Sequence, residues 1–141
     1  MRCLVFSDIP NDALLRWDEI TGETVVLRNP AGYPDGNTRD RQGRLISCEH
    51  LTHAVVRTEY DGSRTVLIDR FEGKRLNTPN DLAIDRLGRI WFTDPWNERN
   101  IDSTERREYD HQSVYRLDPQ KDGSYKIARV AFDTHLPNGI L

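Results

Sequence analysis

The chain has 141 residues, the size of one ordinary domain, and its 20 basic and 23 acidic residues give a formal net charge of −3. Both kinds of charge are interspersed, which excludes the basic stripe typical of nucleic-acid-binding proteins and the acidic tail of some interaction proteins. No apolar run approaches the roughly 18 residues of a membrane span, and the one near the N-terminus is too short for a signal peptide. We therefore expect a cytoplasmic protein without a nucleic-acid or membrane partner.

Hydrophobic residues make up 36% of the sequence and charged residues 30%. This lean apolar content favours many short, half-exposed strands over buried helices. Cys3 and Cys48 have neither the spacing of a metal site nor that of a disulfide framework, so we expect two reduced thiols.

In chain order, short apolar segments alternate with turn signals, and no segment has the apolar stripe of a helix. Strands are expected at residues 4–8, 13–18, 24–27, 44–48, 54–59, 65–68, 82–84, 90–92, 113–118 and 126–132. Between the third and fourth of these, Pro30, Gly32, Pro34 and Gly36 break the chain repeatedly. The strands at 82–84 and 90–92 form a hairpin whose turn is at 85–88, with Asp at its start and Gly at its end.

Several of these segments repeat. The run DRQGRL at 40–45 recurs as DRLGRI at 85–90, and FSD at 6–8 resembles FTD at 92–94. Similar triplets occur at 14–16, 55–57 and 114–116. Units of four strands that recur about every 40–50 residues are typical of β-propeller blades.

The repeats predict an all-β fold, a partial six-bladed β-propeller of about half the blades, each an antiparallel four-stranded sheet. Residues 4–29 are interpreted as an incomplete blade, 36–72 and 79–133 as blades, and 136–141 as the start of the next inner strand. A polar insertion after residue 95 lengthens the second complete blade. Because an open half would leave sheet faces unpacked, the missing blades of the propeller are an expected partner.

Four segments resemble the gluconolactonase family, which includes regucalcin (senescence marker protein) and bacterial gluconolactonases. They are NTPNDL at 77–82, GNTRDRQGRL at 36–45, SCEH at 47–50 and PNG at 137–139. The resemblance covers essentially the whole chain, which is similar to an internal fragment of a bacterial gluconolactonase. It implies a six-bladed propeller with a divalent metal in its central channel. It also implies hydrolysis of sugar lactones and related esters.

The family's site carries over only in part. Asn138 matches the metal-binding Asn of an Asn-Gly element, and Asn80 matches a channel Asn that contacts substrate and, in some members, lies near the metal. Glu98 falls where regucalcin-like members have a substrate-contacting Glu, whereas Thr78 replaces an Arg of those members. The family's first Glu ligand and the Asp that is also its proposed general base match no residue of this chain. The resemblance thus implies metal ligands Asn80 and Asn138, substrate contacts Asn80 and Glu98, and no catalytic residue.

The expected metal is Ca²⁺, with Zn²⁺ and Mg²⁺ as alternatives, because amide carbonyls offer oxygen ligands without adding charge. Each Asn also has a simpler interpretation, Asn80 as an Asx-turn before a strand and Asn138 as part of an Asn-Gly turn. Glu49, His50 and His53 could line the channel or suggest a zinc site, but positions i and i+3 of a strand lie on opposite faces. A strand-end or surface role is therefore favoured for them.

Two functions remain open. The first is a metal-dependent sugar-lactone hydrolase that is incomplete in this chain, acting on gluconolactone, another aldonolactone or a phosphotriester-like ester. The second is a non-catalytic, truncated propeller or one half of a split protein.

Overall fold

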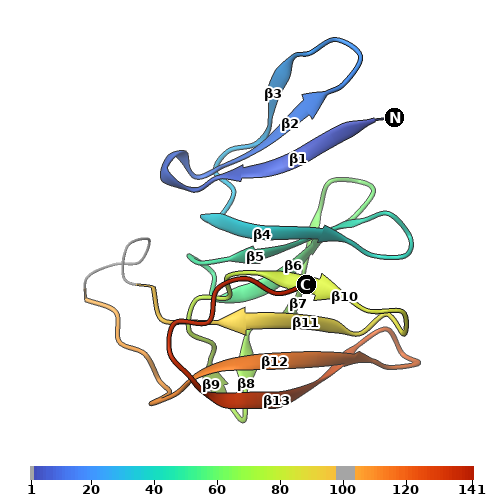
Figure 1. The fold of residues 1–141 in the computed structure, drawn as a ribbon. Coiled ribbons are helices and arrows are strands. Elements are labelled where there is room, and N and C mark those ends of the chain that lie inside the picture. Colours follow the sequence, from blue (N-terminus) through green and yellow to red (C-terminus); the bar gives the residue numbers. More distant parts are fainter. Residues whose placement is uncertain (1, 98–103) are drawn as a thin grey trace.

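The computed structural model describes residues 2–97 and 104–141, and their regular elements are strands except for one short 3₁₀ helix, Ile9–Asn11 (Figure 1). The first sheet contains β1 (Cys3–Asp8), β2 (Ala13–Asp18) and β3 (Thr24–Arg28). The second contains β4 (Pro34–Arg39), β5 (Leu45–Glu49), β6 (Ala54–Thr58) and β7 (Arg64–Ile68). The third contains β10 (Leu82–Ile84), β11 (Ile90–Asp94), β12 (Gln112–Pro119) and β13 (Tyr125–Thr134), and β8 (Arg70–Phe71) pairs with β9 (Lys74–Arg75). The predicted all-β class is confirmed.

The three larger sheets follow one another from the β1 sheet at the top of Figure 1 to the β10–β13 sheet at the bottom. Within each sheet, neighbours in sequence pair antiparallel, so every sheet is a simple meander. The predicted hairpin pairs Leu82 with Phe92 and Ile84 with Ile90. In the part of the chain that the structure describes, no helix is long and apolar enough to cross a membrane.

The structure differs from the sequence expectations in two places. Strand β4 runs through Pro34 and Gly36, which the sequence alone suggested were chain breakers; Pro34 is the first residue of the strand, where its fixed φ is tolerated. Residues 135–141 are irregular rather than the start of a strand. Their polar groups bind the β10–β11 segment instead: Thr93 Oγ1 donates to Asn138 O, and Ile140 N donates to Asp81 Oδ2.

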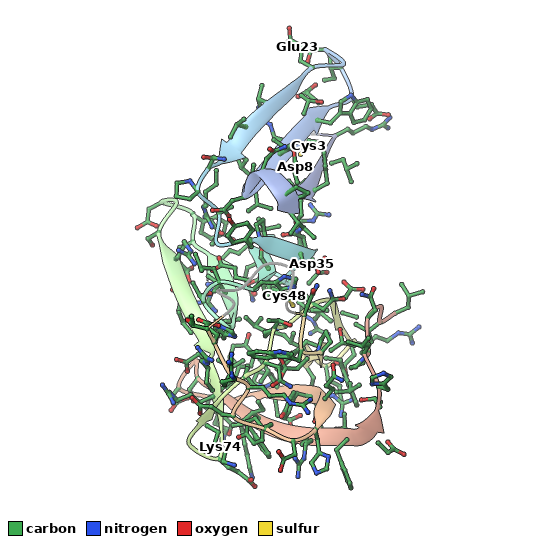
Figure 2. The ribbon with its side chains drawn as sticks, turned by 90° about the vertical axis from the view of Figure 1, so that its left-hand side faces the viewer. Cys3, Asp8, Glu23, Asp35, Cys48 and Lys74 are labelled. Carbon is green, nitrogen blue, oxygen red and sulfur yellow. The ribbon has the colours of Figure 1, made fainter. Side chains whose placement is uncertain are left out.

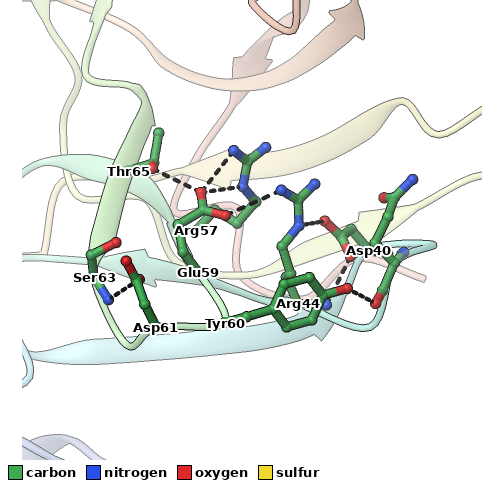
Figure 3. A network of polar contacts seen from close by, with 9 residues as sticks. Asp40, Arg44, Arg57, Glu59, Tyr60, Asp61, Ser63 and Thr65 are labelled. Atoms are coloured by element: carbon green, nitrogen blue, oxygen red, sulfur yellow. Dashed lines mark hydrogen bonds and ion pairs between the residues drawn. The ribbon is translucent and has the colours of Figure 1, made fainter.

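The repeated DRxGR run is a turn that its aspartate holds together. Asp40 Oδ1 accepts hydrogen bonds from the backbone N–H groups of Gln42 and Arg44, and Oδ2 binds Arg44 Nε at 2.7 Å (Figure 3). Asp85 repeats all three contacts with Leu87 and Arg89 in the next sheet. The repeat therefore stabilises the turn between the first two strands of each four-stranded sheet.

The apolar core lies between the second and third sheets. Its fully buried members come from both sheets and the segment joining them: Ile46, Cys48, Val55, Leu76, Leu82, Ile90, Phe92, Tyr115 and Leu117. The rings of Phe92 and Tyr115 stack with their centroids 5.3 Å apart. By contrast, the outer strand β3 keeps Val25, Val26 and Leu27 exposed. The second and third sheets therefore share a core that the first sheet does not join.

Gly36 brings the second and third sheets into direct backbone contact. Its N–H donates to Asn80 O at 2.7 Å. A Cβ on this residue would lie 2.4 Å from Asp81 Oδ1, 2.7 Å from Asp81 Cα and 2.8 Å from Asn80 O. Since two of these three atoms belong to backbone, only glycine permits this approach.

The Gly36→Ala substitution should therefore destabilise the chain by about 1–3 kcal/mol, because the added methyl group forces the two segments apart. Urea unfolding of the purified variant measures this loss. Gly139→Ala is the matched control, since its Cβ would lie 3.9 Å from the nearest atom, Asp81 Oδ2. Equal stability of the two variants would contradict the close approach.

A buried carboxyl group, that of Asp94, lies at the end of β11. Asp94 is fully buried; the backbone N–H of Asn77 donates to Oδ2 at 2.9 Å, and Oδ1 has no hydrogen-bond partner among the described residues. Burial raises the pKa of Asp94 from 3.8 to about 8, against the opposing effect of the Asn77 N–H. The carboxyl group is therefore protonated in the folded chain at neutral pH.

Between about pH 4 and pH 8 the folded chain holds a proton on Asp94 that the unfolded chain has released, so the free energy of unfolding should fall as the pH rises through this window. Asp94→Asn keeps the shape and removes the titration. We expect urea unfolding to give a slope of up to about 1.4 kcal/mol per pH unit in the wild type and a flatter profile in the variant.

Asp61→Asn is the control for this pH profile. The Ser63 side chain and backbone N–H lower the pKa of Asp61, so its titration lies below the window and its variant should keep the wild-type slope. An Asp94→Asn profile as steep as that of the wild type would contradict the account.

Candidate functional site

Asn80 and Asn138, the two predicted metal ligands, lie on either side of Thr93. The backbone N–H of Asn80 donates to Thr93 O at 2.9 Å, and Thr93 Oγ1 donates to Asn138 O at 2.7 Å. Asn80 is almost fully buried, whereas Asn138 is exposed. The fold thus brings together two residues that are far apart in the sequence.

Asp35, at the start of β4, completes this cluster. Its Oδ2 accepts a hydrogen bond from Asn80 Nδ2 and lies 3.1 Å from Nε2 of the fully buried His50. The Asp35 side chain keeps 24% of its surface exposed, so the carboxylate lies at the boundary of the core. Figure 2 shows Asp35 near the middle of the molecule, close to Cys48. Asp35, His50, Asn80 and Asn138 together make the candidate site.

Sequence reasoning missed Asp35, although a repeat pointed to it. Each of Asp35, Asn80 and Asn138 follows a proline, at 34, 79 and 137, and the first two are 45 residues apart, like the two DRxGR turns. The contacts repeat as well: Ser7 Oγ donates to Asp35 O at 2.6 Å, as Thr93 Oγ1 does to Asn138 O. The Pro-Asx step therefore marks one structural position in successive units.

Cys48 lies under the site but is no candidate nucleophile. The side chain is fully buried. Burial raises the pKa of its thiol, and the nearby carboxylates of Asp35 and Asp81 raise it further. Since the thiolate is the reactive form, this thiol is inert at neutral pH. Both cysteines of the chain are free, and Cys3 is exposed.

Of the strand-end or surface interpretation of Glu49, His50 and His53, the surface part is wrong because all three residues are buried, whereas Glu49 does end strand β5. The end of β5 is covered by residues 31–33, and Glu49 forms an ion pair with Arg64 and accepts a hydrogen bond from Thr52 Oγ1 at 2.8 Å. His53 Nε2 lies 2.9 Å from Glu105 Oε2. Only His50 of the three reaches the candidate site.

Of the two remaining residues from the family resemblance, Thr78 lies among the described residues and makes contacts outside the cluster. Thr78 Oγ1 donates to Pro95 O at 2.5 Å and accepts from Asn97 N at 2.9 Å, so its hydroxyl group is engaged locally. Glu98, the predicted substrate contact, lies outside the described residues.

The oxygen-bearing side chains of the candidate site are of the chemical type that binds a hard cation. Among residues 2–97 and 104–141, no three His, Cys, Asp or Glu side chains gather as a metal-binding group. The cluster offers instead the carboxylate of Asp35 and the amide of Asn80, and the exposed Asn138 is tied to it through its backbone carbonyl. Because a carboxylate only accepts hydrogen bonds, the Asn80 amide turns its nitrogen to Asp35, and its carbonyl oxygen has no partner among the described residues. Carboxylate and amide oxygens are the ligands that Ca²⁺ and Mg²⁺ prefer.

Comparison with known proteins agrees with this fold. The family model described as "SMP-30/Gluconolactonase/LRE-like region" matches residues 1–141. A gluconolactonase from Zymomonas mobilis is 29% identical over 152 residues, covering 97% of this chain and 41% of the relative. A gluconolactonase structure from Xanthomonas campestris is 39% identical with a TM-score of 0.84, covering 93% of this chain and 44% of that one.

A second structure, of a putative gluconolactonase, has a TM-score of 0.87 and 30% identity and covers 97% of this chain and 47% of that one. The chain therefore spans less than half the length of each of these three gluconolactonases. The predicted partial propeller of about half size is confirmed by this coverage together with the antiparallel four-stranded sheets. The chain belongs to the SMP-30/gluconolactonase/LRE-like family.

Proposed function

We propose that this chain supplies part of the metal and substrate site of a sugar-lactone hydrolase, and that alone it does not catalyse the reaction. The observation that carries the proposal is the family match over residues 1–141, and gluconolactonases are among the relatives. The metal, Ca²⁺ with Zn²⁺ and Mg²⁺ as alternatives, is part of the proposal. So is a cytoplasmic location, which the two free cysteines support.

In this proposal Asn80 and Asn138 hold the cation through their amide oxygens, and Asn80 also orients the sugar. The cation would supply Lewis acidity toward the lactone carbonyl. Neutral amides suit this task because they do not offset the positive charge that does the polarising. Asn80 is well placed as a ligand because Asp35 and the Thr93 carbonyl fix both its side chain and its backbone.

Hydrolysis also needs a base that removes a proton from the attacking water. The family's Asp for this role matches no residue of the chain, and the buried, protonated Asp94 cannot substitute at neutral pH. The chain is therefore assigned binding groups without the full catalytic set.

A second candidate, a non-catalytic half that pairs with further blades, is favoured by the free edge of β1. In their sheets β5 and β11 each pair with an inner strand, β4 and β10. Strand β1 holds the corresponding place, with Ser7 contacting Asp35 as Thr93 contacts Asn138, but no inner strand pairs with it among the described residues. A free strand edge recruits another strand.

We expect the purified chain to hydrolyse δ-gluconolactone no faster than buffer, with or without calcium chloride, because it lacks the base. In amide NMR spectra, calcium chloride with 1,5-anhydro-D-glucitol, an unreactive ring analogue of the lactone, should shift signals around Asn80 and Asn138. The Asn80→Ala variant should lose these shifts, whereas Asn11→Ala, outside the site, should keep them.

Calcium-dependent hydrolysis by the wild-type chain would contradict its assigned incompetence. Absence of any shift around Asn80 and Asn138 would contradict the site itself and leave the non-catalytic half as the better account.

A further inference from the structure

We propose that Asp35 is the anionic ligand of the candidate site and binds a divalent cation together with Asn80 and Asn138. The inference rests on the proposed function, and it adds a carboxylate that the family comparison did not supply. Three observations carry it: the position of Asp35 in the repeat, the orientation of its carboxylate, and its charge environment beside the unused oxygen of Asn80.

The first observation is positional. Asp35 is the third member of the Pro-Asx series that contains both predicted ligands, and its backbone is anchored by the same kind of hydroxyl contact as that of Asn138. The backbone bond from Gly36 N to Asn80 O, 2.7 Å long, holds the first two members of the series side by side. Asp35 therefore lies beside Asn80, which occupies the equivalent position of the next repeat and is a predicted metal ligand.

The second observation is that the carboxylate is oriented. Asn80 Nδ2 donates to Oδ2 of Asp35, and Nε2 of His50 lies 3.1 Å from the same oxygen; His50 is itself fixed by full burial and by its backbone bond to Tyr33 O, 3.1 Å long. Oδ1 has no hydrogen bond or ion pair among the described residues, while the side chain is partly exposed. One oxygen is held and the other is available, as in metal-binding carboxylates whose second oxygen is fixed by neighbours.

The third observation concerns charge. Two other carboxylates of the second sheet are paired with arginine: Asp40 binds Arg44 at 2.7 Å, and Glu49 forms an ion pair with Arg64. Among the described residues, no lysine or arginine forms an ion pair with Asp35, and the imidazole of His50 is the ring beside it. A carboxylate without a cationic side chain, next to a nearly buried amide oxygen without a partner, is suited to an added cation.

The neighbouring acid, Asp81, has a different task. Its Oδ1 accepts a hydrogen bond from the backbone N–H of Leu82 at 2.9 Å, and its Oδ2 accepts one from the backbone N–H of Ile140 at 3.1 Å. Both oxygens are therefore engaged by backbone donors. Of the two carboxylates, Asp35 rather than Asp81 therefore keeps an oxygen that is available to a cation.

The test is a titration of the purified chain with calcium chloride, and with terbium chloride as a luminescent substitute. Asp35→Asn should weaken binding by at least about tenfold, because the site loses its only charged ligand. Asp61→Asn, which removes an exposed hairpin carboxylate, is the matched control and should bind like the wild type. The side-chain carboxyl carbon of Asp35 is also followed by NMR in the wild type, which needs no substitution and should shift on calcium addition while that of Asp61 does not.

The outcomes separate this inference from the function on which it rests. Equal affinity of Asp35→Asn and the wild type, or an unmoved Asp35 carboxyl signal while Asn80 and Asn138 respond, overturns the role of Asp35 and leaves the proposed function intact. A wild-type chain that binds neither cation overturns both.

Discussion

The backbone contact between Gly36 and the 80–81 segment is the constraint on which the site depends. It joins the second and third sheets at the point where their inner strands begin, and it leaves no room for a side chain. The same contact sets Asp35 beside Asn80, because these residues flank it directly. The same contact therefore packs the two sheets together and positions Asp35 and Asn80 in the candidate site.

Some acidic side chains around this contact are fully used in hydrogen bonds that stabilise the fold, whereas others could still bind a ligand. Asp40 and Asp85 are saturated by the loops that they close, and Asp81 by the backbone of the neighbouring segments. Asp94 lies in the core, where burial favours its neutral form. Among these five acids, Asp35 alone combines partial exposure, a fixed orientation and an oxygen without a described partner. Hydrogen-bond saturation, rather than residue type, separates the candidate ligand from the other acids.

Much of the fold was predictable from the sequence because it rests on local signals. The alternation at 82–84 and 90–92 and the DRxGR turns depend on neighbours a few residues apart, and both form as expected. Strand β4 was not expected, since Pro34 and Gly36 look like breakers until the distant 80–81 segment explains the glycine. The burial of His50 depends on its cover by residues 31–33, which no local pattern records. Asp35 was marked by the Pro-Asx repeat, but its contact with Asn80 joins two sheets and could not be read from neighbouring residues. Asn80 and Asn138 were found through family resemblance rather than through spacing.

The most direct measurement of the central claim is a crystal structure of the chain soaked in terbium chloride, with the ion located by its anomalous scattering. The account predicts a single strong anomalous peak within bonding distance of the side-chain oxygens of Asp35, Asn80 and Asn138. A peak bound only elsewhere, or no peak in crystals where these side chains are accessible to solvent, would contradict it.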